Sequence, residues 1–279
     1  MTVRIVTDSS CDLPQAMADA VGIRIVPLSV RFGDTEYIDR TTITATEFWS
    51  KCAASATLPE TAAPSQGSFE ETYRSLAAEG ATAIVVVALS SDLSATMQSA
   101  VLAARAVAPE IDVRIVDSRN ASMGLGLTVL ACAELAKTGA SADEVVARAQ
   151  SVIPRMRLYA ALDTLDNLKK GGRIGGAKAM LATVMSIKPL ISITNGLVEE
   201  AGKQRTRSKA LAHLVDILRN QQVPIERLAI LNAQCADIDA FVAMVKEVYT
   251  GEIIVGDIGA VIGTHAGQGT IGIVFLLSA

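Results

Sequence analysis

The sequence has few of the residues that most often carry metal or redox chemistry. Its 279 residues include two histidines and one tryptophan, and aromatic residues make up 4%. The four cysteines are widely spaced and form no C-x-x-C motif, so we expect free thiols, no metal site and no cofactor. The first lies in a polar segment far in sequence from either histidine, which favours a structural thiol over a nucleophile. The cysteines are Cys11, Cys52, Cys132 and Cys235.

Long hydrophobic runs are also missing. The longest, 83–89 and 271–277, fall well short of the roughly 18 residues that a transmembrane helix needs, and both are typical of buried strands. The first residues do not show the charged, apolar and small-residue regions of an export signal. We therefore expect a cytoplasmic protein without a transmembrane segment.

Neither strong charge nor a nucleotide motif is present. The formal net charge is −4 with 25 Lys and Arg, which gives no basic footprint for nucleic acid. The sequence contains no G-x-x-x-x-G-K-[ST] phosphate loop and no G-x-S-x-G nucleophile elbow. Residues 267–272 do match G-x-G-x-x-G, but they precede a final apolar run without a following helix, which excludes the dinucleotide fingerprint.

Half of the sequence is hydrophobic, and short aliphatic runs alternate with helical segments through its first half. This alternation is typical of a parallel sheet covered by helices. We predict strands at 3–6, 23–30, 83–89 and 113–116, capping boxes at 44–47, 68–71 and 141–144, and a hairpin at Gly33-Asp34 appended to the sheet. Residues 1–154 are predicted to form an N-terminal three-layer α/β/α domain with a mainly parallel sheet.

The pattern changes near 153–155, where we place a domain boundary. Residues 155–279 are predicted to form a second α/β domain, and Asn195-Gly196 is a strong hairpin signal that makes its sheet mixed. Strands are expected at 158–162, 189–194, 197–200, 228–231, 253–257 and 270–277, with helices near 209–220 and 237–249. A ligand cleft is expected between the two domains.

Serines recur where strands of the first half end. Ser9 follows the first strand, Ser90 and Ser94 follow the strand at 83–89, and Ser118 follows the strand at 113–116. In open parallel sheets ligands bind at the carboxyl ends of strands, and hydroxyls beside helix starts are suited to anions. The alternative is that each side chain only caps its own helix.

The segment Leu168-Lys-Lys-Gly-Gly-Arg-Ile174 follows an apolar stripe at helical spacing. Gly171 and Gly172 can adopt the left-handed conformation that ends a helix, so Arg173 leaves the turn in a fixed direction. A guanidinium held in this way is suited to a carboxylate or phosphate, although a solvated charge after the helix is the alternative.

Two further side chains are candidates for the same cleft. His265 lies between Gly263 and Gly267, in a predicted loop before the last strand, where it either reaches a ligand or packs internally. Thr61 lies in a predicted loop at 60–65 just before a helix, where it presents a hydroxyl.

Together these segments resemble the DegV family of bacterial fatty-acid-binding proteins, essentially from end to end. No single segment is decisive, but their order and spacing are specific. The matching segments are 7–14, Thr61 with Pro64-Ser65, 89–100, Asp117-Ser118, 122–126, 168–174, 187–189 and His265-x-Gly267-x-Gly269.

The resemblance implies two α/β domains with a long-chain fatty acid between them. The carboxylate would be held by Thr61 and Ser94, backed by Arg173 and His265. It also implies a carrier without chemistry of its own, which presents the acid to a fatty acid kinase catalytic subunit that makes acyl phosphate for phospholipid synthesis. Such a role leaves room for transient membrane contact during lipid exchange. The sequence departs from the family pattern near this site at Ala62, Ala63, Ala95 and Gln268.

Two other functions stay open from the residues. One is a Ser/His acyl hydrolase that uses Ser94 and His265, for which no orienting carboxylate is identifiable. The other is a module that binds a small anion or phosphate without lipid.

Overall fold

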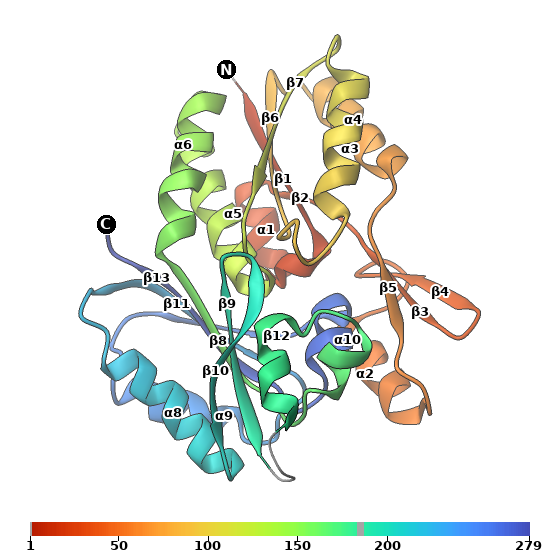
Figure 1. Ribbon diagram of the computed structural model, residues 1–279. Helices are drawn as coiled ribbons and strands as arrows, with labels where there is room; N and C mark the ends of the chain where they lie inside the picture. The colour runs from red at the N-terminus through yellow and green to blue at the C-terminus, as the bar shows by residue number, and fades with distance from the viewer. Residues whose placement is uncertain (1, 183–186) are drawn as a thin grey trace.

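The N-terminal half of the chain forms a parallel sheet between two layers of helices. The structure, a computed structural model, describes residues 2–182 and 187–279. The sheet has the order β2-β1-β6-β7, and each neighbouring pair is parallel, which confirms the mainly parallel sheet (Figure 1). Its strands are β1 (Val3–Asp8), β2 (Arg24–Val26), β6 (Ala83–Ala88) and β7 (Asp112–Asp117).

Different helices cover the two faces of this sheet. On one face, α3 (Gln66–Ala78) packs against the strands through Phe69, Tyr73 and Leu76. Beside it, α4 (Thr96–Val107) packs through Ala100, Ala103 and Val107. The other face is covered by α1, α5 and α6. These helices span Gln15–Val21, Ser122–Lys137 and Ala142–Val152.

A small antiparallel sheet lies beside the parallel one. It has the order β4-β3-β5, with strands β4 (Thr35–Ile38), β3 (Ser29–Phe32) and β5 (Glu60–Ala62). The Gly33-Asp34 hairpin is confirmed, but it belongs to this separate sheet. The single strand expected at 23–30 was wrong: the chain leaves the parallel sheet after Val26, because Pro27 has no N–H to continue the ladder. The expected loop at 60–65 was also wrong at its start, where β5 pairs with β3.

The C-terminal half forms a mixed sheet, as expected. Its order is β10-β9-β8-β13-β11-β12, in which β11 and β12 are parallel and the other neighbours antiparallel. The strands are β8 (Met156–Ala161), β9 (Lys188–Thr194), β10 (Leu197–Gln204), β11 (Ile225–Asn232), β12 (Ile253–Asp257) and β13 (Ile271–Leu277). Helices α8 (Arg207–Arg219) and α9 (Ile238–Lys246) cover one face.

Two of the three predicted capping boxes are confirmed. Thr44 with Glu47 starts α2 (Ala45–Ala54), and Ser141 with Glu144 starts α6, each with both reciprocal hydrogen bonds. The third prediction was wrong, because α3 begins one turn earlier with Ser65 as its N-cap.

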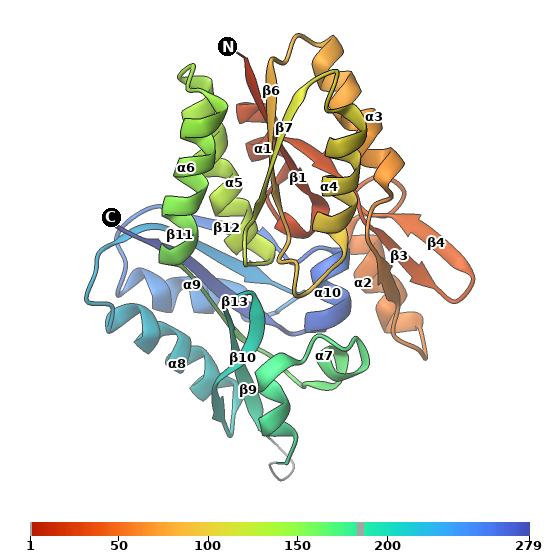
Figure 2. The same ribbon diagram turned by 45° about the horizontal axis from the view of Figure 1, so that its top comes forward.

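Helix α5 lies between the two sheets (Figures 1 and 2). Residues 122–133 of this helix are all buried, because it packs on β1 and β6 on one side and on β8, β11 and β13 on the other. The largest hydrophobic cluster accordingly contains residues of both halves, among them Ile5, Val85, Leu158 and Val274. The two halves therefore share one core instead of meeting across a wet interface.

Candidate functional site

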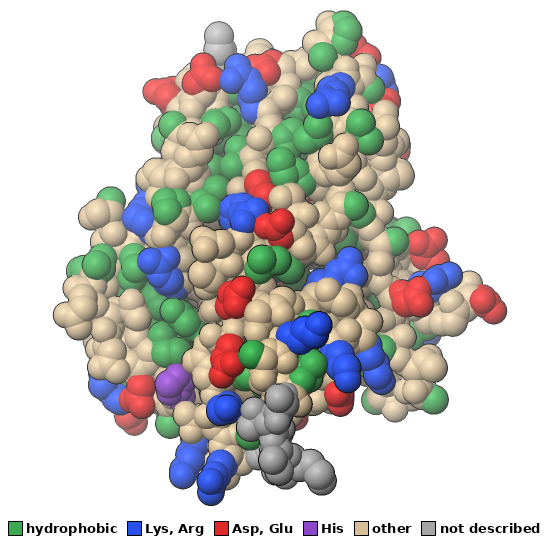
Figure 3. Space-filling view, viewed as in Figure 1, with side chains coloured by type: hydrophobic (Ala, Val, Ile, Leu, Met, Phe, Trp, Pro, Cys, Tyr) green, Lys and Arg blue, Asp and Glu red, His purple; other side chains and the backbone are tan. Residues whose placement is uncertain are grey.

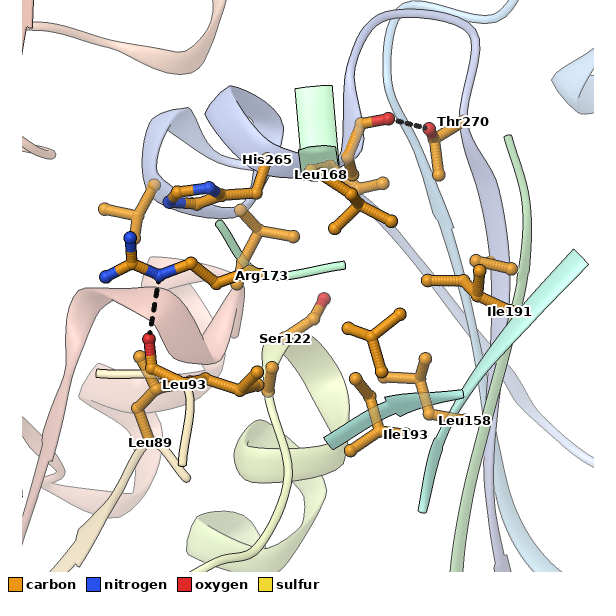
Figure 4. Close-up of a pocket in the computed structure, with 18 of the residues that line it drawn as sticks. Leu89, Leu93, Ser122, Leu158, Leu168, Arg173, Ile191, Ile193, His265 and Thr270 are labelled. Atoms are coloured by element: carbon orange, nitrogen blue, oxygen red, sulfur yellow. Dashed lines mark hydrogen bonds between the residues drawn. The ribbon is translucent and has the colours of Figure 1, made fainter. Parts of the chain in front are cut away.

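A pocket lies between the two halves, beside the buried helix α5. Both halves line it, and Figure 4 shows strand residues such as Leu158 and Ile191 facing residues of the helical segments across it. It encloses about 870 Å³ not filled by protein atoms, open solvent at its mouth included. Thr61, Ser94, Arg173 and His265 all line this pocket.

Arg173 is positioned by the end of a short helix. Two hydrogen bonds close the end of α7 (Asp166–Lys170). The N–H of Arg173 donates to the carbonyl of Leu168 at 3.0 Å, and the N–H of Gly172 donates to the carbonyl of Lys169 at 3.2 Å. These are the two bonds of a Schellman motif, with Gly172 in the left-handed region at φ 72°. The left-handed turn expected at this pair therefore rests on Gly172, while Gly171 stays helical at φ −73°.

The guanidinium of Arg173 is tethered to both halves of the chain. Its Nε donates to the carbonyl of Leu93 at 3.1 Å, as Figure 4 shows, and its Nη1 donates to the carbonyl of Gly171 at 2.6 Å. Within the described residues Nη2 has no hydrogen-bond partner. Because one edge is held by carbonyl groups, the guanidinium has a fixed orientation and retains free donors for an anion.

His265 lies beside Arg173, in the last turn of α10 (Ala260–Ala266). The loop expected there was wrong, because the helix continues until Gly267, at φ 81°, ends it. Asn167 of α7 donates its Nδ2 to the carbonyl of Thr264 at 3.0 Å, which holds α7 and α10 together. This contact explains why two segments almost a hundred residues apart bring Arg173 and His265 to one place.

The imidazole of His265 also contacts the small N-terminal sheet. Its Nε2 lies 3.0 Å from Oγ1 of Thr61 on β5, while Nδ1 is buried without a hydrogen-bond partner among the described residues. Burial, assisted by the positive charge of Arg173, lowers the pKa of His265 to about 4. His265 is therefore neutral at pH 7 and acts as a hydrogen-bonding group rather than as a charge.

Ser94 lies in the turn between β6 and α4. Its hydroxyl accepts from the N–H of Thr96 at 3.2 Å and lies 2.9 Å from the Thr96 hydroxyl. It is half-buried at the pocket wall, and the carbonyl of its neighbour Leu93 holds Arg173. The same turn thus carries one candidate head-group ligand and orients another.

Away from these four residues the pocket lining is largely aliphatic. Leucine, isoleucine, valine and alanine side chains come from β8 to β11, β13, α7, α10 and adjoining loops, and Ser122 and Thr270 are the other two polar side chains among the residues described there. Sequence reasoning did not find this lining, because aliphatic residues of a pocket wall have the same pattern as those of a filled core. The aliphatic residues include Leu28, Leu89, Leu158, Leu168, Ile191, Ile193, Val198, Val261 and Val274.

The other three predicted serines lie elsewhere. Ser9 accepts from the N–H of Leu28 at 3.0 Å, Ser90 donates to the carbonyl of Gly196 at 2.8 Å, and Ser118 donates to the carbonyl of Asn120 at 3.1 Å. All three are buried and none lines the pocket. Their hydroxyls bond to backbone groups of loops and, in the described residues, do not cap α1, α4 or α5, so the helix-capping alternative does not describe them either.

The four departures from the family pattern are peripheral. Ala62, Ala95 and Gln268 are exposed and Ala63 is half-buried, and none of them lines the pocket.

The surface around Arg173 is basic. Lys169, Lys170 and Lys178 are exposed on the same segment, and Figure 3 shows Lys and Arg side chains gathered on the lower half of this face. In the described part of the chain, no three His, Cys, Asp or Glu side chains are grouped to hold a metal ion. No helix within residues 2–182 and 187–279 is both long and apolar enough to span a bilayer. The site is thus an apolar pocket whose polar end lies in a positive field.

The comparison with protein families agrees with this arrangement. The sequence model of the DegV family matches residues 2–278. The chain belongs to the DegV family. A DegV domain-containing protein of Streptomyces coelicolor is 37% identical over 277 residues, covering 98% of this chain and 97% of that protein.

Solved DegV structures have the same fold. A DegV family protein from Thermus thermophilus, described as fatty acid binding, superimposes with a TM-score of 0.90 at 35% identity, with 100% of both chains covered. DegV from Bacillus subtilis, described as a fatty acid binding protein, gives a TM-score of 0.90 at 28% identity, again over 100% of both chains. The parallel N-terminal and mixed C-terminal sheets are therefore those of the DegV fold.

Proposed function

We propose that this protein is a cytoplasmic carrier that binds a long-chain fatty acid, with the tail in the aliphatic pocket and the carboxylate at Thr61, Ser94, Arg173 and His265. The observation that carries the proposal is that one pocket is lined both by aliphatic side chains and by this polar cluster. The fatty-acid-binding descriptions of the Thermus and Bacillus proteins support the same ligand class.

The tail supplies most of the attraction in this proposal. Burial of a methylene contributes about 0.8 kcal/mol, so a chain of roughly fifteen methylenes gains on the order of 12 kcal/mol before the costs of ordering. A short phosphorylated metabolite would leave the aliphatic lining in contact with water. The pocket lining therefore favours a lipid over the small-anion alternative.

The head group is proposed to lie at the Arg173 end. A carboxylate taken from water needs charge-assisted donors, and the free Nη2 of Arg173 with the hydroxyls of Thr61 and Ser94 can supply them. Neutral His265 can donate or accept through Nε2, where it already meets Thr61. No second cation is required, because Arg173 balances the single negative charge.

The geometry favours binding over hydrolysis. A histidine base in a catalytic triad is oriented by a third group, commonly a carboxylate, yet Nδ1 of His265 has no hydrogen-bond partner among the described residues. The Ser94 hydroxyl is engaged with Thr96. We therefore propose that the protein has no catalytic activity of its own.

Ligand content is the decisive measurement. The protein is purified, its lipids are extracted and analysed by mass spectrometry, and the delipidated protein is titrated with palmitate and oleate. We expect a bound acyl chain and saturable binding of at least one acid. Absence of both would overturn the proposal, and steady turnover of acyl-nitrophenyl esters that Ser94→Ala abolishes would establish the hydrolase instead.

We further propose that the carrier presents its ligand to a fatty acid kinase catalytic subunit, which makes acyl phosphate for phospholipid synthesis. The exposure of Arg173 supports this, because a carboxylate bound there lies near the surface with its tail directed inward. Incubation of the loaded protein with such a subunit and ATP should produce acyl phosphate. Failure with several kinase subunits that are active on their own carriers would contradict the proposal.

A further inference from the structure

Two hydroxyl groups line the pocket in addition to those of Thr61 and Ser94. Ser122 and Thr270 line the same cavity as the aliphatic residues, and both are buried, with exposed fractions of 5% and 1%. Figure 4 shows the Ser122 oxygen directed into the pocket, between Arg173 and His265 on one side and Leu158 and Ile193 on the other. Carrying a purely hydrocarbon tail does not require a polar atom at this position.

A buried carboxylate fixes the proton of Ser122. The Ser122 hydroxyl donates to Oδ2 of Asp12 at 2.6 Å, and Oδ1 of Asp12 accepts the N–H of Gly259 at 3.0 Å. Asp12 is 4% exposed and does not line the pocket. Ser122 also has φ 51°, in the left-handed region that side chains other than glycine, asparagine and aspartate rarely adopt. The backbone and the carboxylate thus together hold this hydroxyl in place.

The proton of Thr270 is used in the same way. Its hydroxyl donates to the carbonyl of Ala266 at 2.9 Å. A hydroxyl has one proton and two lone pairs, so Ser122 and Thr270 both present only acceptor lone pairs to the pocket. The complementary group on a ligand is a donor, and on an acyl chain the simplest donor is a hydroxyl.

We propose that Ser122 is a specificity-determining residue that lets the pocket accept a long-chain fatty acid with a hydroxyl on the chain carbon that reaches it. This inference rests on the proposed function, because it places a second polar contact along the same tail. A chain hydroxyl buried at a carbon that reaches neither Ser122 nor Thr270 loses its water without a partner, which weakens binding. A keto group is an acceptor and finds no donor at Ser122.

The charge state of Asp12 sets the conditions for a test. Burial raises the pKa of Asp12 to about 7, against the lowering effects of the bonds from Ser122 and Gly259 and of the charge on Arg40, while Asp39 raises it. At pH 8 the carboxylate is ionised and can only accept, so the Ser122 proton points to it. Binding is therefore measured at pH 8.

The experiment moves a hydroxyl along the chain. Stearate, a series of monohydroxystearates and the matching oxostearates compete with a fluorescent fatty acid for the delipidated protein. We expect most monohydroxystearates to bind with about tenfold or more lower affinity than stearate, as for a buried polar group without a partner. The position that reaches Ser122, with at most one adjacent position, should bind at least as well as stearate, and the oxo acid of that position should not. A position that reaches Thr270 is distinguished because Ser122→Gly leaves it unchanged.

Ser122→Gly removes the hydroxyl and tolerates the positive φ. In this variant the affinity for the favoured hydroxystearate, taken relative to that for stearate on the same variant, should fall to the level of the other positions. The matched control is Thr128→Val, which removes another buried hydroxyl of α5, one that donates to Gly124 at 2.8 Å and does not line the pocket. Thr128→Val should keep the wild-type preference for the favoured hydroxyl position.

Asp12→Asn is a second variant that keeps a polar partner for Ser122. The amide can donate to Ser122, which frees the Ser122 proton to donate into the pocket, so the oxo acid at the favoured position should gain affinity over wild type. Uniform loss at every hydroxyl position with normal stearate binding would overturn this inference alone. Survival of every preferred position in Ser122→Gly would also overturn it. Absence of stearate binding would overturn the proposed function itself.

Discussion

His265 packs directly against Gly171, at the turn that directs Arg173. A Cβ on Gly171 would lie 2.3 Å from Nδ1 of His265, although the backbone of Gly171 has ordinary helical angles. Gly171 is therefore needed because there is no room for a side chain, whereas Gly172 is needed because of its left-handed backbone conformation. Substituting each glycine separately distinguishes the two requirements.

Gly171→Ala should displace the imidazole and weaken fatty acid binding by tenfold or more, since the new methyl occupies the position of the ring edge. Gly172→Ala is the control, because nothing lies within 4 Å of its Cβ and its cost is that of alanine at φ 72°, about 1–2 kcal/mol of stability. Ligand titration and chemical denaturation of both variants distinguish the effects. Equal affinities would contradict the packing argument.

Arg173→Ala should weaken binding of the acid by roughly 1.5–3 kcal/mol, the range for hydrogen bonds to a charged group. Arg173→Lys keeps the charge but lacks the planar fork tethered to Leu93, so a partial loss is expected. Calorimetric titration with oleate gives both values.

The control for Arg173 is Lys178→Ala, which removes a nearby exposed cation that does not line the pocket. It should change affinity by less than about 0.5 kcal/mol at 0.15 M salt, where exposed charges are screened. If Lys178→Ala weakened the binding of oleate as much as Arg173→Ala does, the local positive charge, and not direct hydrogen bonds from Arg173, would account for the affinity.

The lowered pKa of His265 predicts an acid-sensitive contribution to stability. His265 takes up its proton near pH 6.5 in the unfolded chain but only near pH 4 in the folded protein. The free energy of unfolding therefore falls as the pH drops from 6.5 to 4. The loss attributable to His265 is about 3 kcal/mol when complete. Relative to His265→Gln, the wild type should therefore become less stable from pH 6.5 to 4 and stay parallel to the variant above pH 7.

The contribution of Asp12 to stability should change with pH in the opposite direction to that of His265. Burial raises the pKa of Asp12 to about 7, so the folded protein binds this proton more tightly than the unfolded chain does. Its contribution favours folding at low pH and is lost as the pH rises toward 7. Urea denaturation of wild type and Asp12→Asn across pH 4–8 should show the wild type losing stability relative to the variant as pH rises. The reverse slope would contradict the assigned burial effect.

The β9–β10 hairpin is fastened to the N-terminal half at its tip. The carbonyl of Gly196 accepts from Ser90, that of Asn195 accepts from Arg119, and Arg119 pairs with Asp92 at 2.5 Å. A Cβ on Gly196 would lie 2.7 Å from the Ser90 hydroxyl and 2.8 Å from Cζ of Arg119. This turn therefore lacks room for any side chain.

Gly196→Ala should cost clearly more stability than the same change at the other hairpin. Gly33 has φ 57° with nothing within 4 Å of its Cβ, so Gly33→Ala costs only the backbone strain of about 1–2 kcal/mol. Gly196→Ala adds the clash, roughly 1–3 kcal/mol more, and should also speed release of bound acid. Equal midpoints in urea for the two variants would show that the hairpin tip is free.

The sequence predicted the elements whose signals are local. Alternation of strands and helices, the Asn195-Gly196 turn and two capping boxes are each determined within a few residues, and all are present. Predictions failed where tertiary contact decides: β5 forms because β3 offers it an edge, and α10 continues through His265 because it packs against α2 and α7.

The site was predictable only in part for the same reason. Arg173 could be recognised because glycines adjacent in sequence direct it. The hydroxyls of Ser9, Ser90 and Ser118 had an equally favourable local pattern, and only the positions of Leu28, Gly196 and Asn120 in space show that they are engaged elsewhere. No local signal connects Ser122 with Asp12, which is 110 residues away.

The buried helix α5 constrains how a ligand can exchange. Because α5 packs on strands of both sheets, swinging the two halves apart would expose most of the central hydrophobic cluster. A hinge-like opening would thus approach global unfolding in free energy. Under the proposed function we expect a fatty acid to exchange through small movements at the rim, where the five-residue α7 and the hairpin tip are held by a few hydrogen bonds. Its residence time would then be set by these local bonds, and its affinity by the whole pocket.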